Sequence, residues 1–121
     1  MVLIFAEDGT LEIRDCMEDV IQQCEGIDVH SEVYRFYDKD GRYLRPVFDV
    51  PVSEKRFLWF FRAVDSGKYH LEPTESAEAI GEDPLWVALD ETLALEPNKY
   101  FSSLEELKSS FRSRGIMVDA P

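Results

Sequence analysis

Two histidines and two cysteines are the side chains in this sequence best suited to act as a general base, a nucleophile or a metal ligand. His30 and His70 lie in separate segments, and no His-x-x-His or Cys-x-x-Cys spacing is present that would predict a metal site. Cys16 and Cys24 fall in one predicted helix, where the α-helical rise separates them by about 12 Å, too far for a disulfide. We therefore expect structural roles for all four side chains. The alternative is a cleft in which His30 or His70 acts as an acid–base group.

The segment from Asp38 to Gly41 has the residue types of a calcium-binding loop without its spacing. In such a loop a glycine stands at about position six and a glutamate at about position twelve. Here Gly41 is the fourth residue and Asp49 the twelfth, and a hairpin turn accounts for the same residues. The Gly-x-Ser-x-Gly, Walker and Gly-x-Gly-x-x-Gly motifs do not occur. The sequence thus predicts neither a metal nor a cofactor.

The distribution of charge is the most informative feature of the sequence. The chain carries 13 Lys and Arg residues against 25 Asp and Glu residues, a formal net charge of −12. No lysine or arginine occurs between Lys68 and Lys99. If the carboxylates of this stretch share one face, their field would speed encounter with a cationic protein. We expect such a partner to contact these carboxylates and one nearby aromatic side chain: Glu72, Glu75, Glu78, Glu82, Asp83, Asp90, Glu91, Glu96 and Tyr100.

The net charge also argues against two other classes of partner. Phosphate backbones and anionic membranes both repel an acidic chain, so we expect no nucleic acid and no membrane. One alternative is an RNA-binding sheet face, which would combine aromatic and basic side chains. A second is that the acidic stretch is only a solvated helix face and loop that aids solubility. The side chains available for an RNA-binding face are Tyr34, Phe36, Arg42, Tyr43, Arg45, Lys55, Arg56 and Arg62.

The first third of the chain predicts a hairpin followed by a helix. Asp8-Gly9 stands between two β-like runs and indicates a tight turn, so we expect strands at 2–7 and 10–14. Asp15 has the residue type and position of a helix N-cap. Apolar residues at helical spacing then predict a helix over 16–25, which Gly26 would end.

Two further hairpins are predicted in the middle of the chain. The first joins strands at 32–37 and 42–50, and the second of these contains Pro46. Because proline cannot donate to a ladder, we expect that strand at a sheet edge. The next hairpin joins strands at 55–64 and 68–72 through a turn at Asp65-Ser66-Gly67. The apolar run 57–61 predicts a central strand covered on both faces, or a strand at an interface.

The last third predicts two helices and a short strand. Asp83-Pro84 is a cap followed by proline at the first helical position, and an apolar stripe from Leu85 to Leu93 follows. Ser103 begins a second helix, with a capping box completed three residues later. Residues 116–118 could add a final strand.

Together these elements predict a single α+β domain over 1–121. We expect an antiparallel sheet of about five or six strands built from hairpins, with two or three helices mainly on one face. The N-terminal segment lacks the pattern of a signal peptide, and no apolar run approaches about 18 residues. Two thiols without a partner suit a reducing compartment. We therefore expect a cytoplasmic protein.

The leading hypothesis for function is a non-enzymatic, acidic protein-binding module. By analogy of class alone, small acidic domains without catalytic motifs include many bacterial inhibitors and immunity proteins, which cover basic toxins with carboxylates. One alternative is a small enzyme or ligand-binding domain with a cleft that combines a histidine and carboxylates. Another is a homodimer formed through the 57–61 strand.

Overall fold

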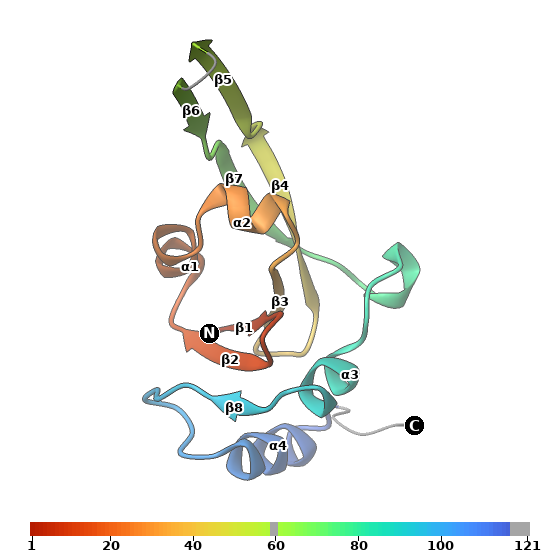
Figure 1. Ribbon diagram of the computed structural model, residues 1–121. Helices are drawn as coiled ribbons and strands as arrows, with labels where there is room; N and C mark the ends of the chain where they lie inside the picture. Colours follow the sequence, from red (N-terminus) through yellow and green to blue (C-terminus); the bar gives the residue numbers. More distant parts are fainter. Residues whose placement is uncertain (59–60, 117–121) are drawn as a thin grey trace.

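A computed structural model describes residues 1–58 and 61–116 of the chain, and its centre is a sheet of six strands (Figure 1). The strands lie in the order β7-β4-β3-β1-β2-β8. Neighbouring strands are antiparallel except β2 and β8, which run parallel. The α+β class and the mostly antiparallel sheet are thereby confirmed.

The elements of the described ranges follow one another as hairpins separated by short helices. In chain order they are β1 (Val2–Ala6), β2 (Thr10–Arg14), α1 (Met17–Gln23), α2 (Gly26–His30), β3 (Tyr34–Asp38), β4 (Tyr43–Val50), β5 (Ser53–Leu58), β6 (Phe61–Asp65), β7 (Lys68–Pro73), the 3-10 helix η1 (Glu78–Ile80), α3 (Leu85–Asp90), β8 (Ala94–Leu95) and α4 (Leu104–Ser113).

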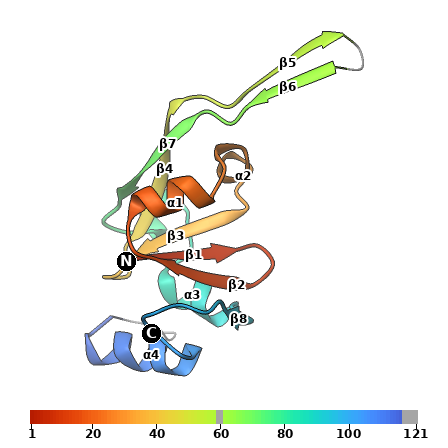
Figure 2. The same cartoon turned by 90° about the vertical axis from the view of Figure 1, so that its left-hand side faces the viewer.

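The sheet is covered on both faces. Val2 and Ile4 of β1 pack in one core with residues of α1 and α2, whereas Leu3 and Phe5 pack in the other with residues of α3 and α4. Figure 2 shows α1 and α2 on one side of the sheet and α3 and α4 on the other. The helices therefore divide between the two faces instead of gathering mainly on one. The reason is that β1 is apolar at successive positions, which requires cover on both sides.

The first helix begins and ends differently from the prediction. Cys16, not Asp15, is the N-cap of α1, because the Asp15 carboxylate instead accepts from Lys99 Nζ at 2.9 Å and from the Tyr100 hydroxyl. Gly26 does not end a helix but begins α2. A Cβ at Gly26 would lie 1.9 Å from the Ser66 carbonyl oxygen, so this position needs glycine for close packing against the β6–β7 junction.

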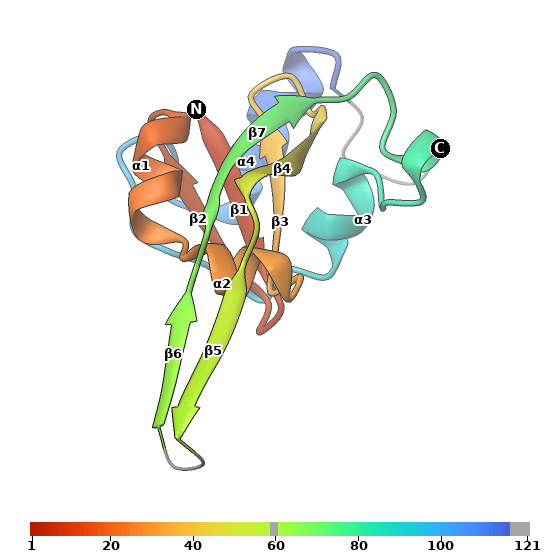
Figure 3. The ribbon, with the colours of Figure 1, turned by 90° about the horizontal axis from the view of Figure 1, so that it is seen from above.

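The pairing of the third hairpin was also wrong. β7 pairs with β4, and β5 pairs with β6 in a separate two-stranded sheet. Asp65-Ser66-Gly67 is therefore an interruption between β6 and β7, not a turn that reverses the chain. Residues 57, 58 and 61 lie in the two-stranded sheet and not in a central strand, and 59–60 fall outside the described residues. The β5–β6 hairpin, which we call the arm (residues 53–65), extends away from the six-stranded sheet (Figure 3).

Pro46 lies in an interior strand and not in an edge strand. β4 stands between β7 and β3, and Pro46 is paired in register with Leu71. The ladder between β3 and β4, however, extends only to Leu44. Beyond Leu44, β7 is the only described strand that pairs with β4, so one side of β4 is unpaired there. Proline has no backbone N–H to donate, and it is tolerated on such an unpaired side as it is in an edge strand.

The predicted helix from Leu85 extends only to Asp90. The backbone N–H groups of Leu93 and Ala94 both donate to the Gly9 carbonyl, which draws the chain into β8 beside β2. The second predicted helix is confirmed as α4, in which Ser103 Oγ accepts from Glu106 N at 3.1 Å. The predicted strand at 116–118 falls largely outside the described residues. Among the described helices, none is long and apolar enough to cross a membrane.

Candidate functional site

The acidic loop (residues 74–84), which joins β7 to α3, is held to the body of the protein along its length. At its start, the N–H and the hydroxyl of Thr74 both donate to the Tyr43 carbonyl at 3.0 Å. In its middle, Ala77 is buried in the core, and its carbonyl accepts from Glu82 N at 2.9 Å. At its end, the Tyr37 hydroxyl donates to the Asp83 carbonyl. The loop therefore presents its side chains from a fixed backbone.

Three carboxylates of this loop are available for an outside partner. Glu75 and Glu78 are exposed, Glu82 is half-buried, and none of the three carboxylate groups makes a hydrogen bond or ion pair among the described residues. Burial raises the pKa of Glu82, and the charge of Glu32 raises it further. Ile80 of the same loop is 43% exposed and lines a pocket with Glu82. The loop thus combines unpaired negative charge with an exposed apolar side chain.

Arg35 of β3 neutralises two of the other predicted carboxylates. Its guanidinium donates to Asp83 at 2.8 Å and to Glu91 at 3.0 Å, and so fastens the end of the acidic loop to the end of α3. These pairs are partly exposed, so they serve mainly to fix geometry. Asp83 and Glu91 are therefore less available to a cationic partner than Glu75 and Glu78.

Glu72 belongs to a separate cluster on β4 and β7. Its carboxylate contacts His70 Nε2 at 2.8 Å and lies 3.5 Å from Arg45, while Asp49 contacts His70 Nδ1 at 2.8 Å. These contacts raise the pKa of His70 and lower that of Glu72. Because both ring nitrogens of His70 face carboxylates, neither has a lone pair free to accept a proton from a substrate. The geometry does not suit His70 to a role as general base.

The remaining predicted site residues lie away from the acidic loop. Asp90 is exposed at the end of α3, and Glu96 follows β8, where it lines a shallow pocket with Asp8 and Glu12. The Tyr100 hydroxyl donates to Asp15. Glu75 and Glu78 line one pocket of the acidic loop, and Glu82 lines another. Asp90, Glu96 and Tyr100 lie in other parts of the molecule.

A pocket of about 460 Å³ adjoins the acidic loop. Glu82 and Ile80 line it from the loop, His30 from the end of α2, and Glu32 from the turn that follows α2. The His30 ring also makes an edge contact with Phe48, with centroids 5.7 Å apart. Glu32 has a φ of 59°, in the left-handed region that a non-glycine residue rarely adopts. Its place at this pocket was missed because no local signal in the sequence connects 32 with 82.

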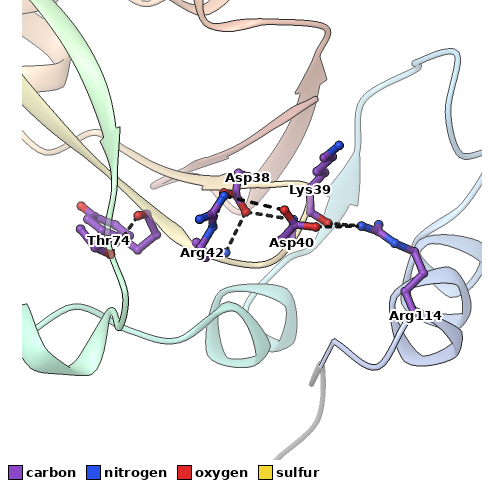
Figure 4. A network of polar contacts seen from close by, with 7 residues as sticks. Asp38, Lys39, Asp40, Arg42, Thr74 and Arg114 are labelled. Carbon is purple, nitrogen blue, oxygen red and sulfur yellow. Dashed lines mark hydrogen bonds and ion pairs between the residues drawn. The ribbon is translucent and has the colours of Figure 1, made fainter.

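The β3–β4 turn uses its aspartates internally. Figure 4 shows the Asp38 carboxylate accepting from the N–H groups of Asp40 and Arg42, at 2.9 Å each, and from Arg42 Nε at 2.8 Å. Arg114 reaches over from α4 and donates to the Lys39 carbonyl at 2.7 Å. Within residues 1–58 and 61–116, no group of three or more His, Cys, Asp or Glu is placed to hold a metal ion.

The cysteines occupy different environments. Cys24 is buried in the core beneath α1 and α2, and burial raises the pKa of its thiol to about 11. Cys16 is half-buried at the start of α1. The high pKa of the Cys24 thiol makes it a poor nucleophile at neutral pH.

The chain matches no known family model, no curated protein and no solved structure.

Proposed function

We propose that this protein is a non-enzymatic binding module that captures a cationic protein on its acidic loop. The observation that carries the proposal is the exposure of Glu75 and Glu78, which have no side-chain partner within residues 1–58 and 61–116, on a loop whose backbone is held. A fixed loop loses little conformational freedom on binding, which favours affinity. Ile80 of the same loop is 43% exposed and supplies apolar area.

Charge and apolar contact would act at different stages of binding. The net charge of −12 attracts a cationic protein over several tens of Å at low salt and raises the association rate. Burial of Ile80 and pairing of the loop carboxylates would then slow dissociation. Together they make the acidic loop the expected centre of the interface.

Within this class we propose an inhibitor of the immunity type. Such a protein covers the active site of a basic enzyme, such as a nuclease, with carboxylates on a rigid scaffold. The acidic loop, held at Thr74, Ala77 and Asp83, meets this requirement. A gene for a basic toxin next to the gene for this chain would support the assignment.

A pull-down with the full chain tests the proposal. The chain carries a tag and is exposed to a lysate of its source cell at an ionic strength of about 0.01 M and of about 1 M, where the Debye length falls from about 30 Å to about 3 Å. We expect one specific, strongly basic protein at low salt, with binding confirmed between the two purified proteins. Failure to retain a basic protein would remove the support for a cationic partner.

A matched pair of variants locates the surface. In the first, Glu75→Gln, Glu78→Gln and Glu82→Gln remove three charges from the acidic loop; in the second, Glu18→Gln, Glu25→Gln and Glu105→Gln remove three exposed charges elsewhere. We expect the association rate to fall about tenfold or more in the first variant. The second should show a much smaller decrease. Equal effects in the two variants would mean that net charge, not the acidic loop, governs binding.

A second candidate function, the binding of a small ligand, is favoured by the pocket beside the loop. His30, Glu32 and Glu82 line one cavity of about 460 Å³, which is within the size range of ligand sites. Fragment screening by NMR tests this candidate. A fragment that shifts the His30 resonances, and no longer binds His30→Ala but still binds His70→Ala, would support it. The absence of any such fragment would leave the pocket without this role.

A further inference from the structure

β3 and β4 pair with each other only near the turn that joins them. The ladder between the two strands ends at the pair of Phe36 and Leu44. Figure 2 shows β4 turning away from β3 and continuing beside β7. The pocket of about 460 Å³ is lined from both strands beyond the end of the ladder, by Tyr34 of β3 and by Pro46 and Phe48 of β4. It therefore lies between two diverging strands of the sheet.

The hydrogen bonds of β4 determine which side of the strand each backbone group faces. On the β3 side, Asp38 N donates to the Arg42 carbonyl at 2.9 Å. On the β7 side, Thr74 N donates to the Tyr43 carbonyl at 3.0 Å. Because the direction alternates from one residue to the next, even-numbered residues of β4 face β3 and odd-numbered ones face β7. Pro46, which has no N–H to donate, is at one of the even positions.

Phe48 consequently has an unpaired N–H and an unpaired carbonyl on the side of the pocket. The register between β4 and β7 is continuous from Leu44 to Phe48, so the alternation holds over this stretch. Within the described part of the chain, no group forms a hydrogen bond with either backbone group of Phe48 on that side. β4 thus presents an open strand edge to the pocket, and such an edge is a template for pairing with another extended chain.

Two carboxylates without a partner line the same pocket. Glu32 and Glu82 make no side-chain hydrogen bond or ion pair among the described residues. The charge of Glu32 raises the pKa of Glu82, so the two carboxylates are close enough to repel each other. Arg35 and Arg45 also line the pocket, but Arg35 is paired with two carboxylates and Arg45 with one. The charge that remains unbalanced is negative and favours a cation.

We propose that an extended segment of the cationic partner binds in this pocket as an additional strand on the open edge of β4. The backbone of the segment pairs with the N–H and the carbonyl of Phe48, and a lysine or arginine side chain of the segment lies between Glu32 and Glu82. Main-chain hydrogen bonds supply affinity in this mode of binding, and the side chains around the edge supply specificity.

The open edge favours an extended segment over two other occupants. A helix satisfies its own backbone groups internally, so it would leave those of Phe48 unpaired. A small ligand fills the cavity without continuing along the strand. The inference rests on the proposed function for the identity of the partner. It adds a strand edge to the interface beside the acidic loop, because Ile80 and Glu82 of that loop line the same pocket.

Amide hydrogen exchange in the unaltered, full chain tests whether the edge is open. Val47 N–H faces β7 in the pair with His70, whereas Phe48 N–H faces the pocket. In the free protein we therefore expect Phe48 N–H to exchange about tenfold or more faster than Val47 N–H. Equal protection of the two would mean that the edge is already paired. Protection of Phe48 that appears only at high protein concentration would assign the edge to a second copy. Either result would overturn the proposal.

Three short peptides, acetylated and amidated at their ends, are the probes for binding. The first alternates valine with lysine, and we expect it to bind with a Kd below about 1 mM and to protect Phe48 N–H from exchange. The second has the same sequence with each backbone nitrogen methylated, so it keeps its charge but cannot pair as a strand. The third alternates valine with glutamate. The second and third peptides should each bind about tenfold or more weakly than the first.

Each peptide can contradict a different part of the proposal. Equal binding of the methylated peptide would show that charge alone attracts the lysine peptide. Equal binding of the glutamate peptide would show that the carboxylates of the pocket do not select a cation. A lysine peptide that does not bind, or that binds without protecting Phe48 N–H, would overturn the proposed strand.

A matched pair of variants tests the position of the basic side chain. Glu32→Gln with Glu82→Gln removes the two carboxylates of the pocket, and we expect the lysine peptide to bind this variant about tenfold more weakly. Glu18→Gln with Glu105→Gln removes two exposed charges elsewhere and should leave binding close to that of the wild type. Equal weakening in the two variants would mean that the basic side chain does not lie between Glu32 and Glu82.

The strand edge and the proposed function fail in different experiments. If a basic protein is retained in the pull-down but leaves Phe48 N–H open to exchange, the partner binds elsewhere. The strand edge is then overturned, and the proposed function stands. If no basic protein is retained while the lysine peptide binds and protects Phe48 N–H, the proposed function loses its support and the edge remains a site for an extended basic segment.

Discussion

The individual residues of this protein show how the same side-chain type can be bound or available. Asp83 and Glu91 are paired with Arg35, and Glu72 with His70, whereas Glu75 and Glu78 have no partner among the described residues. Asp90 and Glu96 are also exposed and unpaired among the described residues. Pairing therefore makes Glu72, Asp83 and Glu91 less available, and it leaves carboxylates both on the acidic loop and beyond it free to interact with another molecule.

His70 should titrate above the ordinary value for histidine. Its hydrogen bonds with Asp49 and Glu72 favour the protonated ring and raise its pKa above 6.5. The protonated cluster therefore stabilises the fold fully below pH 6.5, and this contribution is lost as the pH rises through the folded-state pKa. NMR titration of the ring protons measures the pKa. Asp49→Asn should lower it and Glu105→Gln should not, and a wild-type value at or below 6.5 would contradict the geometry.

The two thiols should differ in their rates of alkylation. Cys24 is buried, and its thiol pKa is raised to about 11, so less than about one molecule in a thousand carries the thiolate at neutral pH. We expect iodoacetamide to modify the half-buried Cys16 in the native protein and to modify Cys24 only after addition of denaturant. Mass spectrometry of the peptides identifies the site. Rapid modification of Cys24 in the folded chain would mean that α1 and α2 move away from the sheet readily and expose this thiol.

At the scale of elements, close approach decides the course of the chain more than local turn signals do. From the sequence, we expected Gly26 to end a helix and Gly67 to lie in a turn that reverses the chain. In the structure, Gly26 begins α2, and Gly67 lies where β6 passes into β7, with the Val50 carbonyl oxygen 2.3 Å from the place of a Cβ. Both glycines permit backbone contacts at the base of the arm.

Gly26→Ala should destabilise the protein by about 1–3 kcal/mol, as overpacking does elsewhere. The added methyl group would meet the Ser66 carbonyl oxygen, a backbone atom that cannot move aside alone. Gln23→Ala, three residues earlier at an exposed position of α1, is the control and should change stability by less than about 0.5 kcal/mol. Denaturant unfolding followed by circular dichroism measures both. Equal stability of the two variants would show that α2 is loosely packed against the β6–β7 junction.

At the scale of the whole molecule, the acidic body and the weakly basic arm divide the charge unequally. The chain carries −12 in total, and the arm carries +1. Such a net charge opposes the compact state through self-repulsion. The charge of the body supports the proposed attraction for a cationic partner.

Salt should therefore raise the thermal stability of the isolated chain. Between about 0.01 M and about 0.2 M ionic strength, screening reduces the repulsion among the carboxylates, and we expect the Tm to increase by a few degrees. Glu18→Gln with Glu25→Gln and Glu105→Gln should raise the low-salt Tm and reduce its salt dependence. Differential scanning calorimetry at monomeric concentration measures this effect. A Tm that falls with added salt would show that ion pairs such as those of Arg35 outweigh the repulsion.

Properties that depend on neighbours along the chain could be read from the sequence. The turn at Gly9, the cap at Ser103 and the apolar stripe of α4 each involve residues within a few positions of one another, and the structure confirms them. The order of hairpins and helices likewise predicted the α+β class, and composition gave the acidic character. These features follow from local backbone preferences and periodicity, which act before any distant contact forms.

Only the tertiary structure decided which strands pair and which carboxylates remain available. The pairing of β4 with β7, the position of Glu32 beside Glu82 and the attachment of Asp83 to Arg35 all join residues far apart in sequence. Such contacts depend on the free energy of the whole packing arrangement, in which burial on both faces of β1 and close approach at Gly26 outweigh local turn preference. The sequence by itself determined that the protein is acidic; the fold determined that Arg35 and His70 pair with some of the carboxylates and leave Glu75 and Glu78 unpaired among the described residues.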